Sequence, residues 1–233
     1  MMQLVAIVLA VGALVSCGGR IAEIERAADR EREPIVGLPC EGCDAVFQGL
    51  PDSLEWSSRI ASQNEPGDAM RIEGTVRDET GRPMSDVIVY AYHTNARGIY
   101  PTDEGLRGHA AHRHGRLRAW ASTNEAGRYR FDTIRPAGYP DTDLPAHVHM
   151  HVIEVGRCTY YIDDIMFEDD PRLTESMRQR LTLGRGGNGV VKPIQGTAGS
   201  WLVTRDIVLG RGIPGYPERA QKSDASDGGS RRR

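Results

Sequence analysis

The chain has 233 residues, of which 39% are hydrophobic, and this is enough apolar content to bury the core of one domain with extensions. It carries 29 basic and 32 acidic residues, a formal net charge of -3, so it lacks the positive excess that nucleic-acid binding requires. Composition therefore predicts a globular protein and gives no electrostatic case for a nucleic-acid partner.

An apolar run from Leu4 to Val15 opens the chain. It is about as long as the core of a signal peptide and too short to span a bilayer. It ends in Leu14-Val15-Ser16-Cys17-Gly18, which resembles the lipobox of bacterial lipoproteins, where cleavage precedes a cysteine that then carries lipid. No Lys or Arg precedes the run, so a plain secretory signal or a misassigned start codon remain alternatives. We expect residues 1–16 to be a signal peptide, Cys17 to be lipidated, and the protein to be exported as a periplasmic or membrane-anchored bacterial lipoprotein.

Residues 17–34 are rich in charge and predict a tether, which a cysteine-containing extension over residues 35–69 follows. The segment Cys40-Glu41-Gly42-Cys43 lacks the second cysteine pair that a zinc site needs. In an exported chain we therefore expect a disulfide among Cys40, Cys43 and Cys158, although the sequence leaves the pairing open.

Residues 70–209 are predicted to form short strands. Two hairpins are expected, each from two β-favouring runs that flank a turn-forming segment. The first joins residues 71–76 to 86–92, and the second joins residues 116–123 to 127–133. Further strands are expected at residues 147–155, 159–167 and 200–209. Many short strands with few helical intervals favour an all-β fold, an antiparallel β-sandwich with long loops.

One short helix is expected near the C-terminus, over Pro171–Leu183, with Asp170 as its N-cap and Gly184 as its stop. Residues 210–233 are expected to be a disordered tail.

The run His147-Val148-His149-Met150-His151 is the strongest candidate for a functional site. Side chains alternate between the faces of a strand, so His147 and His149 would project the same way, as two ligands of one metal ion must. Tyr139 lies a short loop upstream and is a candidate third ligand, because a loop entering a strand can fold a phenol over the strand's first residues.

Two loops carry further polar aromatic residues. Residues 93–98 lead into Tyr100, a second tyrosine at a point where a strand gives way to a loop. Residues 107–116 carry His109, His112 and His114, which we expect to be solvated and outside the site.

Four motifs follow one another within residues 70–170: Gly98-Ile99-Tyr100, the run from Gly127 to Pro136, Gly138-Tyr139-Pro140, and Pro145-Ala146-His147-Val148-His149. Together they resemble the intradiol ring-cleavage dioxygenases, the family of the catechol and protocatechuate dioxygenases. The resemblance implies a transthyretin-like β-sandwich core and non-haem ferric iron, Fe(3+), as cofactor. It also implies iron ligands at Tyr100, Tyr139, His147 and His149, and phenolate oxygen is a hard donor that suits ferric iron.

The resemblance further implies an oxidoreductase that inserts O2 between the two hydroxylated carbons of a catechol-type aromatic and yields a muconate-type diacid. Its partners would be a small aromatic diol and O2, with membrane contact only through the lipid at Cys17. In the family, the tyrosine that corresponds to Tyr139 leaves the metal when substrate arrives and helps to take a proton, which makes Tyr139 the catalytic residue.

Two positions depart from the family pattern. Leu144 stands where well-studied members carry an arginine over the substrate pocket, and Asp164 precedes Phe167-Glu168 where they often carry a glutamine. We place Leu144, Asp164 and His151 in the substrate pocket or behind the metal ligands. The familiar substrate assignments therefore do not transfer.

Two other interpretations stay open. His147, His149 and His151 could hold zinc or copper, although three ligands from one strand reach a single ion awkwardly. The domain could also be a non-catalytic cell-envelope module on a similar sandwich that binds a metal or another ligand. Colour separates these interpretations, because tyrosinate-to-ferric charge transfer makes a protein red-brown, whereas zinc or an empty site leaves it colourless.

Overall fold

The computed structural model describes residues 34–37, 42–182, 184–196 and 199–218 of the chain. The expected signal peptide, Cys17 and Cys40 lie outside these residues, as do most of the expected tether and residues 219–233 of the expected tail. Among the residues that are described, no helix combines the length and the apolar character that crossing a membrane requires.

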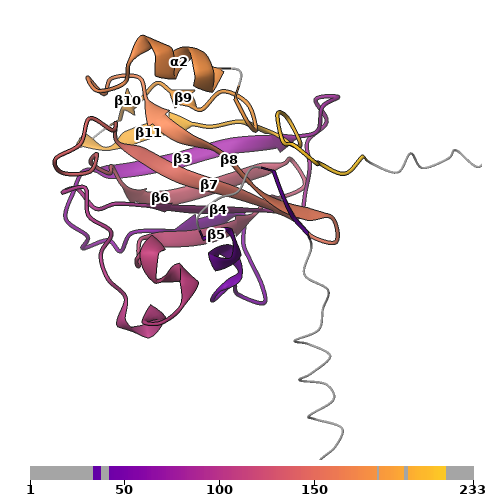
Figure 1. Ribbon diagram of the computed structural model, residues 1–233, viewed down its shortest axis with the longest axis horizontal. Helices are drawn as coiled ribbons and strands as arrows, with labels where there is room; N and C mark the ends of the chain where they lie inside the picture. The colour runs from indigo at the N-terminus through magenta and orange to yellow at the C-terminus, as the bar shows by residue number, and fades with distance from the viewer. Residues whose placement is uncertain (1–33, 38–41, 183, 197–198, 219–233) are drawn as a thin grey trace, which may run out of the picture. The chain divides into compact units, whose positions relative to one another are not determined.

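Two mixed β-sheets make up the described domain (Figure 1). The first sheet contains β1 (Ile35–Val36), β4 (Val87–His93), β5 (Arg118–Ser122), β7 (His147–Glu154), β8 (Cys158–Phe167) and β9 (Val190–Val191). Its order is β1-β8-β7-β4-β5, with β9 beside β8. The second sheet contains β2 (Ser57–Arg59), β3 (Ala69–Arg77), β6 (Arg128–Ile134), β10 (Ile194–Gln195), β11 (Trp201–Thr204) and β12 (Ile207–Val208). Its order is β10-β11-β3-β6-β2, with β12 beside β3.

Antiparallel pairs form the centre of each sheet, and most of the flanking pairs are parallel. β4 runs antiparallel to β5 and β7, β7 to β8, and β3 to β6. β1 and β9 run parallel to β8, β2 to β6, and β11 and β12 to β3. The predicted all-β sandwich is confirmed, with the correction that short parallel strands flank its antiparallel centre.

The two sheets pack face to face through apolar side chains. Ile72 and Phe131 of the second sheet join Val89 and Met150 of the first in one cluster of fully buried residues. Burial of a side chain of this size contributes about 1.5–3 kcal/mol. The core therefore decides which residues of each strand point outward and remain for a site.

Three short 3-10 helices pack together outside the first sheet: η1 (Cys43–Phe47), η2 (Glu104–Leu106) and η3 (Ala110–His114). Ala45, Leu106 and Ala111 form their shared apolar cluster. Cys43 is disulfide-bonded, and Cys158 is a buried thiol in β8.

Neither predicted hairpin forms, although both turns do. The Asp78 carboxylate accepts hydrogen bonds from the backbone of Thr80 and Arg82, and Asn124 accepts from Arg128 in the second turn. β3 and β6 lie in the second sheet, however, whereas β4 and β5 lie in the first. Turn residues fix a local reversal, but the strand that completes each ladder is chosen by packing between distant segments.

The expected boundaries also need correction. β2 lies before residue 70 and pairs with β6, and Ile213 lies after residue 209 and is buried in the core. The helix α2 (Glu175–Thr182) begins later than predicted, with the Thr174 hydroxyl accepting a hydrogen bond from the Met177 backbone. Asp170 instead closes a turn by accepting from the Arg172 backbone.

Candidate metal centre

β7 directs its histidines away from the core. Val148 and Met150 are fully buried between the sheets, so His147 and His149 project from the opposite face of the first sheet. Both residues lie next to the loops that follow β4 and β6, which carry the two predicted tyrosine ligands.

Close backbone contact brings the two tyrosine loops together. Gly98 has φ of +76°, and a Cβ atom there would lie 2.1 Å from the Gly138 carbonyl oxygen. Only glycine adopts this conformation at this distance without strain. The contact places Tyr100, two residues after Gly98, beside Tyr139, which follows Gly138.

The four predicted ligand atoms converge. The Tyr100 oxygen lies 2.7 Å from the Tyr139 oxygen and 2.8 Å from His149 Nε2. The Tyr139 oxygen lies 3.2 Å from His147 Nε2 and 3.4 Å from His149 Nε2. Metal bonds of about 2 Å place neighbouring ligand atoms about 3 Å apart, so this spacing suits one shared ion.

Both imidazoles present an unprotonated nitrogen to the phenols. His147 Nδ1 lies 2.8 Å from the Pro145 carbonyl oxygen, and His149 Nδ1 lies 3.0 Å from Asp164 Oδ1. Because these oxygens accept hydrogen bonds, Nδ1 carries the hydrogen in each ring and the Nε2 lone pair faces the cluster. This is the tautomer that a metal ligand requires.

Burial shapes the charge of the cluster. It raises the pKa of Tyr100 and of Tyr139, and it lowers the pKa of His147. The phenols therefore stay protonated unless a cation stabilises their anions, and the imidazole stays neutral. Two phenolates and two neutral imidazoles form a mixed oxygen and nitrogen donor set that fits ferric iron.

Asp164 lies behind His149. Burial alone would raise the pKa of Asp164, but interactions with His149, His147 and Tyr161 outweigh burial and lower it. Ligand-capable atoms of His147, His149 and Asp164 all lie within 4.8 Å of one another. The Asp164 contact uses His149 Nδ1, whereas the phenols approach Nε2, so the carboxylate supports the ring from its far side.

His151 lies outside the converging group. It is 1% exposed, and its ring packs 5.1 Å from Tyr161 and 5.8 Å from Tyr90 between ring centres. Its Nδ1 has no hydrogen-bond partner among the described residues. The half-buried Leu144 ends the exposed loop after Tyr139, and its carbonyl oxygen accepts from Arg172 Nη1 at 3.3 Å.

His114 is buried, in contrast to the solvated position predicted for it. His109 and His112 are exposed as expected, but His114 is 3% exposed and accepts or donates a 2.7 Å hydrogen bond at the Tyr90 hydroxyl. Its ring stacks on Tyr92 at 3.8 Å, and Tyr92 stacks in turn on His149 at 4.5 Å. The sequence feature that could have indicated this stack is the alternation of tyrosines along β4, which pairs with β7 in the same sheet.

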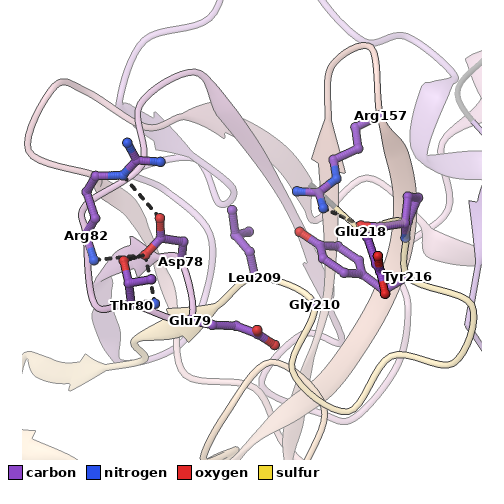
Figure 2. Close-up of a pocket in the computed structure, with 10 residues that line it drawn as sticks. Asp78, Glu79, Thr80, Arg82, Arg157, Leu209, Gly210, Tyr216 and Glu218 are labelled. Atoms are coloured by element: carbon purple, nitrogen blue, oxygen red, sulfur yellow. Dashed lines mark hydrogen bonds and ion pairs between the residues drawn. The ribbon is translucent and has the colours of Figure 1, made fainter. Parts of the chain in front are cut away.

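A separate cavity of about 820 Å³ lies between the turn at residues 78–82 and the C-terminal segment at residues 209–218 (Figure 2). None of the four predicted ligands lines it. Its Asp78 and Arg82 pair with each other at 3.1 Å, and the Tyr216 hydroxyl donates to Glu154. Asp78, Arg82 and Tyr216 of this cavity are therefore already paired.

Comparison with known proteins supports the resemblance. A sequence model of the family described as Dioxygenase matches residues 51–184, a range that includes all four predicted ligands. The chain is 29% identical over 124 residues to a catechol 1,2-dioxygenase from Acinetobacter baylyi and 30% identical over 134 residues to a chlorocatechol 1,2-dioxygenase from Rhodococcus opacus. These alignments cover 45% and 47% of this chain, and 38% and 48% of the relatives. The chain therefore spans less than half the length of either relative.

The fold has relatives among solved structures. The crystal structure of the 3-chlorocatechol 1,2-dioxygenase from Rhodococcus opacus 1CP matches with a TM-score of 0.53 at 18% identity, over 80% of this chain and 76% of that one. At this identity the likeness shows the fold alone, whereas the family match covers more than half of the sequence. The chain belongs to the intradiol ring-cleavage dioxygenase family.

Proposed function

We propose that this protein cleaves a catechol-type aromatic between its two hydroxylated carbons. One ferric ion would be held by Tyr100, Tyr139, His147 and His149. The convergence of their four donor atoms, at 2.7–3.4 Å along the observed contacts, is the observation that carries the proposal. Catechol and O2 would combine without a further reactant, because both oxygen atoms enter the muconate-type diacid.

Ferric iron, when bound, would supply a Lewis-acidic centre that makes the catechol ring reactive toward O2. The residues of the chain would hold the iron and take a proton from the substrate. His147 and His149 are oriented by their Nδ1 hydrogen bonds and would be the ligands that stay bound throughout. Tyr100 is fixed by the Gly98 contact and by the backbone bond from Arg116 to Pro101.

Tyr139 is the ligand that we infer to leave and to take a substrate proton. The loop residues that follow it, 140–143, are exposed, and the hydrogen bonds that its carbonyl oxygen accepts from the Thr142 hydroxyl and from Arg172 Nη1 are long, at 3.2 and 3.5 Å, so this side of the loop is held loosely. Its phenolate would accept the proton of the second catechol hydroxyl, at an oxygen that already lies among the other ligand atoms.

The substrate class rests on the relatives, whose names specify catechol and chlorocatechol. Leu144 removes a positive charge from the expected position over the pocket, so we assign a catechol-type diol and no particular member of that class.

Iron analysis with oxygen uptake tests the proposal. The purified protein should be red-brown, contain about one iron per chain, and consume O2 with at least one member of a catechol panel. Zinc at full occupancy, with no oxygen uptake after iron reconstitution, would contradict it. The non-catalytic envelope module would then be the better interpretation.

We also propose that the protein is exported and anchored through lipid on Cys17. The apolar run of residues 4–15 and the following Ser16-Cys17-Gly18 support this proposal. The full-length protein should fractionate with membranes, and Cys17→Ser should move it to the soluble periplasmic fraction. Identical fractionation of both forms would argue against the anchor.

A further inference from the structure

A β-bulge faces the ligand His149. Along the β7–β8 ladder, Val148 pairs with Ile165 but Met150 pairs with Ile162, so Asp163 and Asp164 together oppose the single residue His149. A bulge of this kind re-aims side chains and is common beside active sites.

The two bulge carboxylates have different partners. Asp163 forms an ion pair with Arg185 at 2.8 Å and accepts from the Arg185 backbone at 2.7 Å. Asp164 Oδ1 instead lies 3.0 Å from His149 Nδ1 and accepts a 2.5 Å hydrogen bond from the Tyr161 hydroxyl. One carboxylate oxygen therefore receives two donors, one of which is the proposed metal ligand.

We propose that Asp164 sets how strongly His149 donates electrons to the metal, with Tyr161 opposing it. This inference rests on the proposed iron site. A carboxylate that draws the Nδ1 hydrogen raises the electron density at Nε2 and makes the imidazole a stronger ligand. The Tyr161 hydroxyl competes for the same Asp164 oxygen, which weakens that pull. Asp164 is thus a positioning residue that acts through His149.

The arrangement predicts spectral shifts of opposite sign. Asp164→Asn keeps the shape and an acceptor but removes the negative charge, so His149 should donate less and the tyrosinate-to-ferric band should move to longer wavelength. Tyr161→Phe removes the competing donor and leaves Asp164 a better acceptor, so the band should move to shorter wavelength. A role in packing alone predicts no such reversal.

The test compares visible spectra of the ferric proteins without substrate, at equal iron content. Asp163→Asn is the matched control, because it removes the same charge from the same bulge without a contact to His149. Its ion-pair partner Arg185 lies over the Tyr161 ring, so its band should move less than that of Asp164→Asn. Opposite shifts for the Asp164 and Tyr161 variants support the inference. Shifts in one direction, or no shift in an iron-loaded Asp164→Asn protein, would overturn it.

Two outcomes separate this inference from the function on which it rests. If Asp164→Asn does not fold, Tyr161→Phe alone still decides, because an unmoved band or a shift to longer wavelength contradicts the opposing role. If the unmutated protein shows no tyrosinate band after iron loading, the proposed iron site itself is wrong, whatever the variants do.

Discussion

The phenol oxygens of Tyr100 and Tyr139 lie 2.7 Å apart, although 39 positions separate the two residues in the chain. Burial raises the pKa of both phenols, so without a cation they share a hydrogen bond. A bound cation would displace the phenol protons, so metal uptake would release protons.

Removal of a histidine ligand should abolish iron binding. His147→Ala and His149→Ala each delete a buried or half-buried donor whose ring is already oriented by a hydrogen bond. We expect iron content by elemental analysis to fall to background, with loss of the visible band. His109→Ala, which alters an exposed loop histidine, is the control and should retain its iron. Full iron content in either ligand variant would exclude that residue from the centre.

The two tyrosines should respond differently to loss of the hydroxyl. Tyr139→Phe should keep most of its iron and shift the visible band, while turnover on a catechol falls on the order of a hundredfold through loss of proton removal. Tyr100→Phe should bleach the tyrosinate band of the substrate-bound complex, because Tyr100 is the tyrosinate that stays. Stopped-flow spectra of both variants under anaerobic conditions measure this difference. A retained band in substrate-bound Tyr100→Phe would reverse the assignment.

Gly98→Ala should damage the metal centre without touching a ligand. The added Cβ would lie 2.1 Å from the Gly138 carbonyl, so the two tyrosine loops must move apart. Gly81→Ala is a matched control, since Gly81 also has positive φ, +87°, but has no atom within 4 Å of a Cβ. Backbone strain alone costs about 1–2 kcal/mol in either variant. Denaturant unfolding should show a larger loss for Gly98→Ala, and only this variant should bind iron more weakly.

Acid should destabilise the metal-free fold between about pH 6.5 and pH 4. Burial lowers the pKa of His93 to about 4, and its Nε2 lies 2.7 Å from the Thr133 hydroxyl as an acceptor. Between these two pH values, His93 binds a proton in the unfolded chain but not in the folded protein. The free energy of unfolding therefore falls as pH falls. A shift of this size corresponds to roughly 3 kcal/mol for a fully buried group. Burial lowers the pKa of His114 and His151 as well, and they act in the same direction.

Urea unfolding at pH 7.5, 6 and 5 measures this effect. His93→Gln retains one donor and one acceptor without a titrating ring, and it should reduce the pH dependence to the part that His114 and His151 contribute. A free energy of unfolding that rises toward pH 5 in the unmutated protein would contradict the argument.

Features that depend on residues close together in the chain were predicted correctly from the sequence. Alternation in β7 put His147 and His149 on one face, and the turn residues Asp78 and Asn124 form the turns predicted for them. The pairing of the strands depends on packing between distant segments, and the sequence did not predict it. Both hairpins were wrong because each turn carries the chain from one sheet to the other. The antiparallel centre followed from strand patterns, whereas the short parallel flanks carry too few residues to show a period.

The same distinction between local and long-range features holds for the residues of the candidate metal centre. The resemblance supplied four ligand residues, and the structure brings their donor atoms together. The burial of His114 depends on its stacking with Tyr92, a residue from another strand. The contact of Asp164 with His149 depends on a one-residue slip in the β7–β8 register, which no periodicity in either strand reveals.

β3 obtains its neighbours from later parts of the chain. β6 covers one edge, and β11 and β12 cover the other with residues 201–208. During synthesis, one edge of β3 therefore stays unpaired until almost the whole domain has been made. Open strand edges are the usual starting points of aggregation. A premature stop codon near residue 200 would thus produce a chain that is prone to aggregate instead of a shorter folded domain. This would happen even though every proposed ligand of the metal centre had already been translated.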